Sequence, residues 1–113
     1  MERFVFDLLN KIGIPCHLKG RSYIETSLKI VSEKGVIMVT KEIYPDVAKV
    51  HKTTPQRVER AIRNAIEYAF NNTSTEVLFE IFGNSINLKS RKTTNSAFIY
   101  GLFEYIKVNF KEA

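Results

Sequence analysis

Residues 53–70 constrain the fold most, because they carry both the start signals and the periodicity of one amphipathic helix. Thr53 and Thr54 are both suitable N-caps, and Pro55 suits the first helical position. Gln56 also stands at capping-box spacing from Thr53. Apolar residues then recur at helical i, i+3, i+4, i+7 spacing; they are Val58, Ala61, Ile62, Ala65, Ile66 and Ala69. The stretch therefore predicts one long helix with one apolar face.

The opposite face of this helix is polar and cationic. On a wheel of about 100° per residue, Arg60 lies directly opposite the apolar stripe. Only charged or amide-bearing side chains lie within about 60° of Arg60; they are Gln56, Arg57, Arg63, Asn64 and Glu67. A face built to pack and a face of guanidinium and amide groups are typical of a helix that reads DNA. A solvated surface face is the alternative.

A shorter helix is predicted just before it. Pro45 favours a helix start, and residues 46–51 place Val47 and Val50 toward the core. Residues 52–54 leave only a tight link to the longer helix. A short helix, a turn of about three residues and a longer basic helix form a helix-turn-helix pattern.

The rest of the chain also predicts helices. They cover residues 2–12, residues 20–34, a segment capped by Ser74 or Thr75, and a last helix that begins at Asn95 or Ser96. Residues 36–39 suit either a buried strand or a further helix running to Tyr44, and we favour the helix because no second strand is available to pair with. Residues 84–93 are polar and basic and predict a loop. The fold class is all-α, with about six helices and a helix-turn-helix, of the winged-helix-like superfamily without a clear wing.

Charge is concentrated in two places. The 113 residues carry a formal net charge of +5. Residues 49–63 alone carry +4, a second cluster of Lys89, Arg91 and Lys92 carries +3, and the remainder is mildly acidic. Local basic patches on such a background suggest a polyanionic partner. Lys49 and Lys52 beside the turn, and Lys92 in the loop, are candidates for phosphate contacts without sequence preference.

Several other functional classes lack support. The chain has the length of a single domain, and no apolar run is long enough to span a membrane. A single cysteine, Cys16, excludes an intramolecular disulfide and fits a reducing cytoplasm. His17 and His51 lack the paired spacing of a metal site, and no catalytic constellation is present. We therefore expect a cytoplasmic protein that is not an enzyme and has no cofactor or metal.

Four stretches of the sequence resemble a known family. They are residues 12–15 with 18–24, 43–45, 53–67 and 94–96, and the most specific part is the Arg-Val-Glu-Arg-Ala-Ile-Arg core at 57–63. In this order and spacing they are similar to the C-terminal effector domain of stage zero sporulation protein A, the response regulator that commits endospore-forming bacteria to sporulation. The similarity runs from about residue 9 to the C-terminus.

The resemblance implies a six-helix domain whose helix-turn-helix binds short boxes of the TGTCGAA type. It also implies contact with RNA polymerase through its sigma factor. The family's base- or phosphate-contacting positions fall on Arg57, Glu59, Arg60 and Arg63, with Arg60 binding a guanine and Glu59 facing a cytosine. Family members commonly have histidine at the position of Asn64.

Gln56 stands where small residues are frequent in the family, so specificity at the edge of the box could differ. Family members also carry a receiver domain with a phosphorylatable aspartate, and residues 1–113 are expected to form a single effector domain without one. Two functional hypotheses follow. The first is a sequence-specific regulator that binds double-stranded DNA, with two copies on adjacent boxes. The second is a helical module that binds sigma factor or a full-length regulator.

Overall fold

The computed structural model describes residues 1–35, 39–87 and 89–110, and within these ranges the fold is all-helical. The predicted all-α class with six α-helices is confirmed. The elements in chain order are α1 (Glu2–Ile12), α2 (Lys19–Lys34), the π-helical turn η1 (Val39–Ile43), α3 (Tyr44–His51), α4 (Pro55–Asn72), α5 (Thr75–Phe82) and α6 (Asn95–Asn109).

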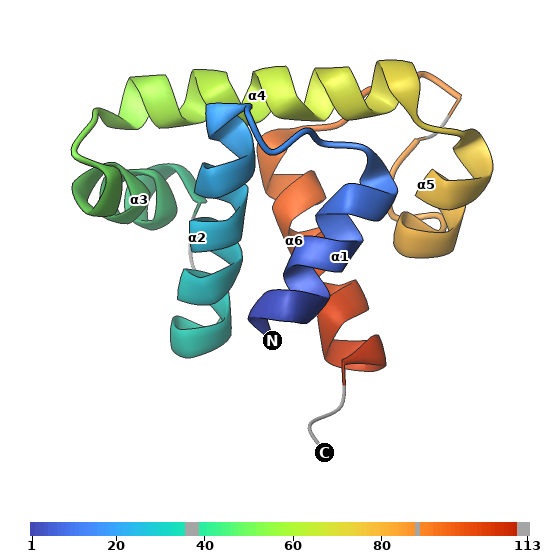
Figure 1. Ribbon diagram of the computed structural model, residues 1–113, viewed down its shortest axis with the longest axis horizontal. Coiled ribbons are helices and arrows are strands. Elements are labelled where there is room, and N and C mark those ends of the chain that lie inside the picture. Colours follow the sequence, from blue (N-terminus) through green and yellow to red (C-terminus); the bar gives the residue numbers. More distant parts are fainter. Residues whose placement is uncertain (36–38, 88, 111–113) are drawn as a thin grey trace.

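The longest helix, α4, runs along one side of the molecule. In Figure 1 it runs along the top of the view, α2 and α6 descend from it, and α3 and α5 lie toward its two ends. Each of the six helices contributes to one buried hydrophobic cluster. Fully buried members, one from each helix in order, are Leu9, Ile24, Val47, Ile62, Leu78 and Ile99. The apolar stripe predicted for α4 is therefore the surface on which α2, α3 and α6 pack.

The predicted helix ends are largely confirmed. The side chains of Thr54, Ser74 and Thr94 each accept a hydrogen bond from the backbone N–H three residues on, at the start of α4, α5 and α6. Thr54 is thus the N-cap of the two residues that the sequence left open. Gly13 ends α1 in the left-handed region, with φ of 88°. Helix α4 continues two residues beyond Phe70, to Asn72.

Two expectations about residues 36–51 need revision. The helix favoured for 36–44 falls partly on residues 36–38, which lie outside the described residues, and residues 39–43 form a π-helical turn that leads straight into α3. The prediction that Val50 faces the core is wrong, because its exposed fraction is 63%. Its place is taken by His51, whose ring packs edge-on against Tyr23 and shares a 2.8 Å hydrogen bond with Thr26.

Helix α2 crosses α4 at very close range. A Cβ atom added at Gly20 would lie 2.1 Å from the backbone oxygen of Ala61 and 2.8 Å from the side chain of Ala65. Only a glycine fits such an approach, since no side-chain atom can occupy that space. The first turn of α2 is therefore fixed against the middle of α4 (Figure 1).

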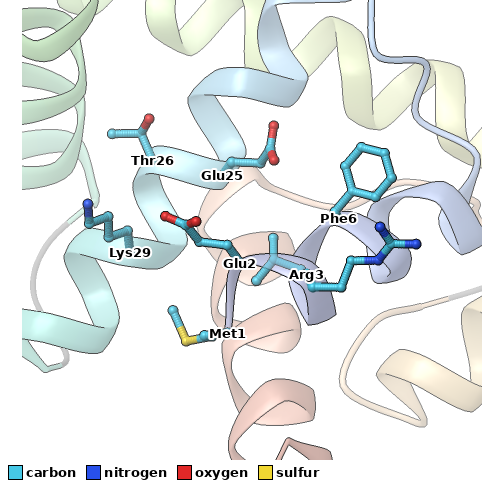
Figure 2. Close-up of a pocket in the computed structure, with 8 residues that line it drawn as sticks. Met1, Glu2, Arg3, Phe6, Glu25, Thr26 and Lys29 are labelled. Carbon is cyan, nitrogen blue, oxygen red and sulfur yellow. The ribbon is translucent and has the colours of Figure 1, made fainter.

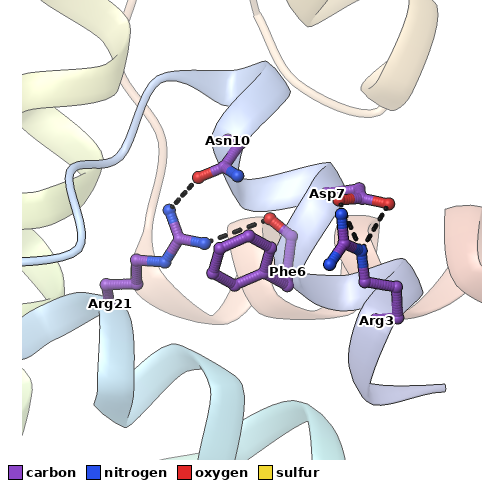
Figure 3. Close-up of polar contacts among 5 residues, drawn as sticks. All are labelled: Arg3, Phe6, Asp7, Asn10 and Arg21. Carbon is purple, nitrogen blue, oxygen red and sulfur yellow. Dashed lines mark hydrogen bonds and ion pairs between the residues drawn. The ribbon is translucent and has the colours of Figure 1, made fainter.

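A buried arginine ties α1 to α2. Arg21 is 2% exposed, and its guanidinium donates to the backbone oxygens of Phe6 and Ile14 and to the side-chain oxygen of Asn10, at 2.6–3.0 Å. Figure 3 shows this group reaching across to Asn10 and Phe6, beside the exposed ion pair of Arg3 with Asp7. The guanidinium carbon of Arg21 also lies 4.9 Å from the centre of the Phe6 ring. Among the described residues, the partners of its guanidinium are two backbone carbonyl oxygens, one side-chain amide oxygen and a ring.

Candidate nucleic-acid interface

Helix α3, the link of residues 52–54 and helix α4 occupy the positions predicted for the helix-turn-helix. Lys52 closes α3 in the left-handed conformation, with φ of 55°, where glycine is the usual residue. The backbone N–H groups of Lys52 and Thr53 both donate to the oxygen of Ala48. This cap reverses the chain within three residues, and the Thr54 cap with Pro55 then starts α4 at once.

The outer face of α4 is exposed as the wheel predicted. Glu59 is partly exposed. Its carboxylate accepts a 3.4 Å contact from the guanidinium of Arg63, one turn later. Within the described parts of the chain, the guanidinium groups of Arg57 and Arg60 have no hydrogen-bond or ion-pair partner. The exposed side chains on this face are Gln56, Arg57, Arg60, Arg63, Asn64 and Glu67.

The buried side-chain amide of Asn95 joins α6 to α3 and α4. Asn95, the first residue of α6, is 4% exposed and donates from Nδ2 to the Tyr44 hydroxyl at 2.9 Å and to the backbone oxygen of Glu59 at 3.1 Å. Burial raises the pKa of Tyr44 above its ordinary value, so the hydroxyl stays neutral. One side chain of α6 thus contacts both helices of the helix-turn-helix. No local sequence signal indicates this contact, because the three residues are far apart along the chain.

Two hollows flank the outer face of α4, one on each side. The first holds about 440 Å³ and lies on the side of the α2 start; it is lined by Lys19, Tyr23, Thr53, Arg57, Arg60, Ala61 and Asn64. The second, also about 440 Å³, lies on the side of the loop between α5 and α6; it is lined by Arg63, Ile66, Glu67, Phe70, Asn71, Arg91, Lys92, Thr93 and Asn95. Cations line both hollows, so the basic surface is wider than α4 itself.

The loop cluster divides into one structural arginine and exposed lysines. Arg91, with φ of 51°, donates from its guanidinium to the backbone oxygens of Phe70 and Thr73 and to the hydroxyl of Thr75, the last at 2.9 Å. It therefore closes the junction between α4 and α5 and is not available to a phosphate. Lys89 and Lys92 are exposed, and the anchored Arg91 keeps Lys92 beside the C-terminal half of α4.

The two candidate lysines near the turn are also exposed. Lys49 lies on the outside of α3 and Lys52 lies in the turn itself. By contrast, Lys34 donates to Asp46 at 2.8 Å and Lys11 contacts Glu80 at 2.5 Å. The hydrogen bond with its carboxylate partner raises the pKa of each of these two lysines. Those two cations are already paired within the protein, whereas Lys49 and Lys52 remain candidates.

A third hollow, of about 670 Å³, has a different character. It lies between α1 and α2 and combines two carboxylates with two cations; its lining is Met1, Glu2, Arg3, Val5, Phe6, Glu25, Thr26 and Lys29 (Figure 2). None of these residues belongs to α3 or α4. Its mixed charge makes it a poor site for a polyanion.

Features of other site classes are missing from the described residues. Residues 1–35, 39–87 and 89–110 contain no group of three or more histidine, cysteine or acidic side chains that could hold a metal ion. No helix in the same ranges is long and apolar enough to cross a membrane. Cys16 is exposed.

A protein-family model matches most of the chain. The family model described as "Sporulation initiation factor Spo0A C terminal" matches residues 5–106. This range contains α2, α3, α4 and α5 in full and most of α1 and α6. It therefore includes the helix-turn-helix and both hollows that flank α4.

Proposed function

The chain belongs to the family of Spo0A C-terminal domains, and from this premise we propose that it is a transcription regulator that reads short TGTCGAA-like boxes through α4. The family is one of DNA-binding effector domains of sporulation regulators, not of enzymes. Double-stranded DNA is accordingly the partner. Residues 1–113 would act as one effector domain, in the cytoplasm, where the DNA is.

The observation that carries this proposal is the outer face of α4. Arg57 and Arg60 are exposed and without a partner among the described residues, in a helix whose opposite face is fully occupied by the core. An arginine fork matches the O6 and N7 acceptors of guanine in the major groove. We assign the guanine contact to Arg60, which stands farthest from the core.

Glu59 and Arg63 would act as a pair on one edge of this face. A carboxylate can accept a hydrogen bond from cytosine N4, and the contact with Arg63 holds the Glu59 carboxylate in place. Gln56 and Asn64 lie at the two sides of Arg60 and would tune the edges of the box. Lys49, Lys52 and Lys92 would contact phosphates and add affinity without sequence preference.

A titration with two duplexes tests the proposal. One duplex carries the box and the other carries the same bases scrambled, and each is titrated at 50 and 200 mM salt. We expect the box to be preferred at both salt concentrations, because each lost base contact costs about 1–3 kcal/mol. Equal affinity for the two duplexes at both concentrations would refute sequence reading.

The family resemblance also supports two finer proposals. Two copies would bind adjacent boxes, because one helix-turn-helix reads only a few base pairs. A sigma factor would contact a surface other than the outer face of α4, since DNA covers that face. Binding of a sigma factor that survives the double substitution of Arg57 and Arg60 by alanine, while box binding is lost, would separate the two surfaces.

A further inference from the structure

Lys19 is a basic residue that neither the helix-turn-helix pattern nor the charge clusters single out. It is exposed, and it is the first residue of α2. The fold brings it to the hollow beside α4, where it joins Arg57 and Arg60. The lining of this hollow holds three cations, two hydroxyl groups and an amide, and no carboxylate. Such a surface attracts an anion.

The next residue explains why Lys19 stands there. The contact of Gly20 with the backbone of Ala61 brings the start of α2 as close to α4 as two helices can come. Ala61 directly follows Arg60 along α4, so Lys19 is held next to that arginine. The rest of α2 leads away from α4 (Figure 1). Of its two other lysines, Lys29 lines the mixed-charge hollow near α1 and Lys34 pairs with Asp46. The position of Lys19 is therefore a product of the helix crossing.

Lys92 occupies the corresponding place on the other side of α4. On the helical wheel Arg57, Ala61 and Asn64 lie to one side of Arg60, and Arg63 and Glu67 lie to the other. The hollow with Lys19 is lined by the first group, and the hollow with Lys92 by the second. An α-helix with its side chains is about 10–12 Å wide and fills a major groove of about 12 Å, so each side of the helix faces one phosphate backbone.

We propose that Lys19 binds a backbone phosphate of one DNA strand while Lys92 binds a phosphate of the opposite strand, with α4 in the major groove between them. This inference rests on the proposed function, and it adds a contact from α2, outside the helix-turn-helix. The two lysines together fix the orientation of α4 in the groove without reading bases.

The first experiment compares two lysines of the same helix. Lys19→Ala and Lys29→Ala each remove one positive charge from the exposed surface of α2. We expect Lys19→Ala to weaken binding to box and scrambled duplexes by the same factor. It should also reduce the slope of log K against log salt by about one. The affinity deficit of the variant relative to wild type should then shrink roughly fourfold between 50 and 200 mM salt. Lys29→Ala should leave the slope at the wild-type value.

Equal slopes for Lys19→Ala and Lys29→Ala would overturn the proposal. So would a loss at Lys19 that is confined to the box duplex, because a phosphate contact has no sequence preference. Thermal unfolding of both variants monitors folding, and Lys19→Gln serves as a second neutral variant that keeps the length of the side chain. A wild-type protein that fails to prefer the box refutes the proposed function; this result is separate from the outcome at Lys19.

The second experiment assigns the strands. Duplexes carry a neutral methylphosphonate in place of one phosphate at a time, on either strand. We expect Lys19→Ala to become insensitive to the substitution on one strand and Lys92→Ala to become insensitive on the other. The same strand for both lysines would refute the arrangement across the groove, and wild-type sensitivity of Lys19→Ala at every position would refute the contact.

Discussion

Four of the six arginines of this chain form two groups that a count of charges does not distinguish. Arg21 and Arg91 each direct the guanidinium at backbone carbonyl oxygens, and each joins two segments of the fold. Arg57 and Arg60 extend from α4 into solvent and have no partner among the described residues. The first group stabilises the structure, and the second is available to a ligand.

The comparison teaches that the partners of a cation indicate its role better than its neighbours in sequence. Arg91 lies between Lys89 and Lys92 in a basic run, yet its guanidinium bonds to carbonyl oxygens around the junction of α4 and α5. Lys19 lies outside both charge clusters, yet it joins the surface of α4. Substitutions that affect stability in one group and DNA binding in the other would establish the division.

The largest expected effect is on stability, at Arg21. We expect Arg21→Met to lower the free energy of unfolding by about 3 kcal/mol, because hydrogen bonds from a charged group contribute about 1.5–3 kcal/mol net. Methionine retains much of the apolar stem against Phe6. Arg3→Met is the matched control on α1, since an exposed ion pair contributes at most about 1 kcal/mol. Chemical denaturation measures the free energy of unfolding of both variants. Equal losses in the two variants would contradict the assignment of Arg21 to the group that stabilises the structure.

The next effect is on binding, at Arg60. We expect Arg60→Ala to weaken box binding by about 1–3 kcal/mol and to relax the preference at one guanine. Its free energy of unfolding should change by less than about 0.5 kcal/mol, as for an exposed residue without a partner. A titration against boxes with each base replaced in turn checks the assignment. An identical loss on scrambled duplex would make Arg60 a phosphate contact and not a base reader.

A smaller effect is expected at Asn95. This residue tests whether one buried side chain can support both the stability of the fold and the preference for box DNA. Asn95→Ala should lower the free energy of unfolding by about 1 kcal/mol for each lost hydrogen bond, and it should also reduce the preference for box over scrambled DNA. Tyr44→Phe removes only one of the two bonds and should have the milder effect on both measurements. An unchanged box preference in a folded Asn95→Ala protein would confine Asn95 to stability.

The smallest effects are expected at Lys52, where one substitution should stabilise the fold and weaken DNA binding. Lys52→Gly should raise the free energy of unfolding by about 1 kcal/mol, because the left-handed conformation costs a side-chain-bearing residue about that much. It should also flatten the salt dependence of DNA binding by about one, through loss of a phosphate contact. Lys52→Ala is the control that removes the charge and keeps the strain, so a stabilised alanine variant would contradict the backbone explanation.

The sequence predicted what local chemistry determines. The N-cap Thr54, the apolar stripe of α4 and the ends of most helices depend on residues within a turn or two, and the structure confirms them. The exposure of Arg57 and Arg60 follows from the same periodicity. Periodicity did not predict the orientation of Val50. In a helix of two turns the inward face depends on which residue packs better against its neighbours, and here His51 packs against Tyr23.

The contacts that complete the candidate site are long-range and left no local signal. Asn95 reaches Tyr44 across 51 positions of sequence, and Arg91 reaches Phe70 across 21. Lys19 meets α4 only because Gly20 permits a close helix crossing. Single-sequence reasoning could identify each residue type but could not place any of these side chains.

Three successive residues at the start of α2 have three different partners. Lys19 lines the hollow beside α4, Gly20 packs on the α4 backbone, and Arg21 bonds to carbonyl oxygens of α1 and of the segment that follows it. Because successive residues point about 100° apart, α2 cannot turn about its axis without breaking at least one of these contacts. Through a single helical turn, a displacement of α1 would thus reach the surface of α4 that we propose binds DNA, without crossing the hydrophobic core.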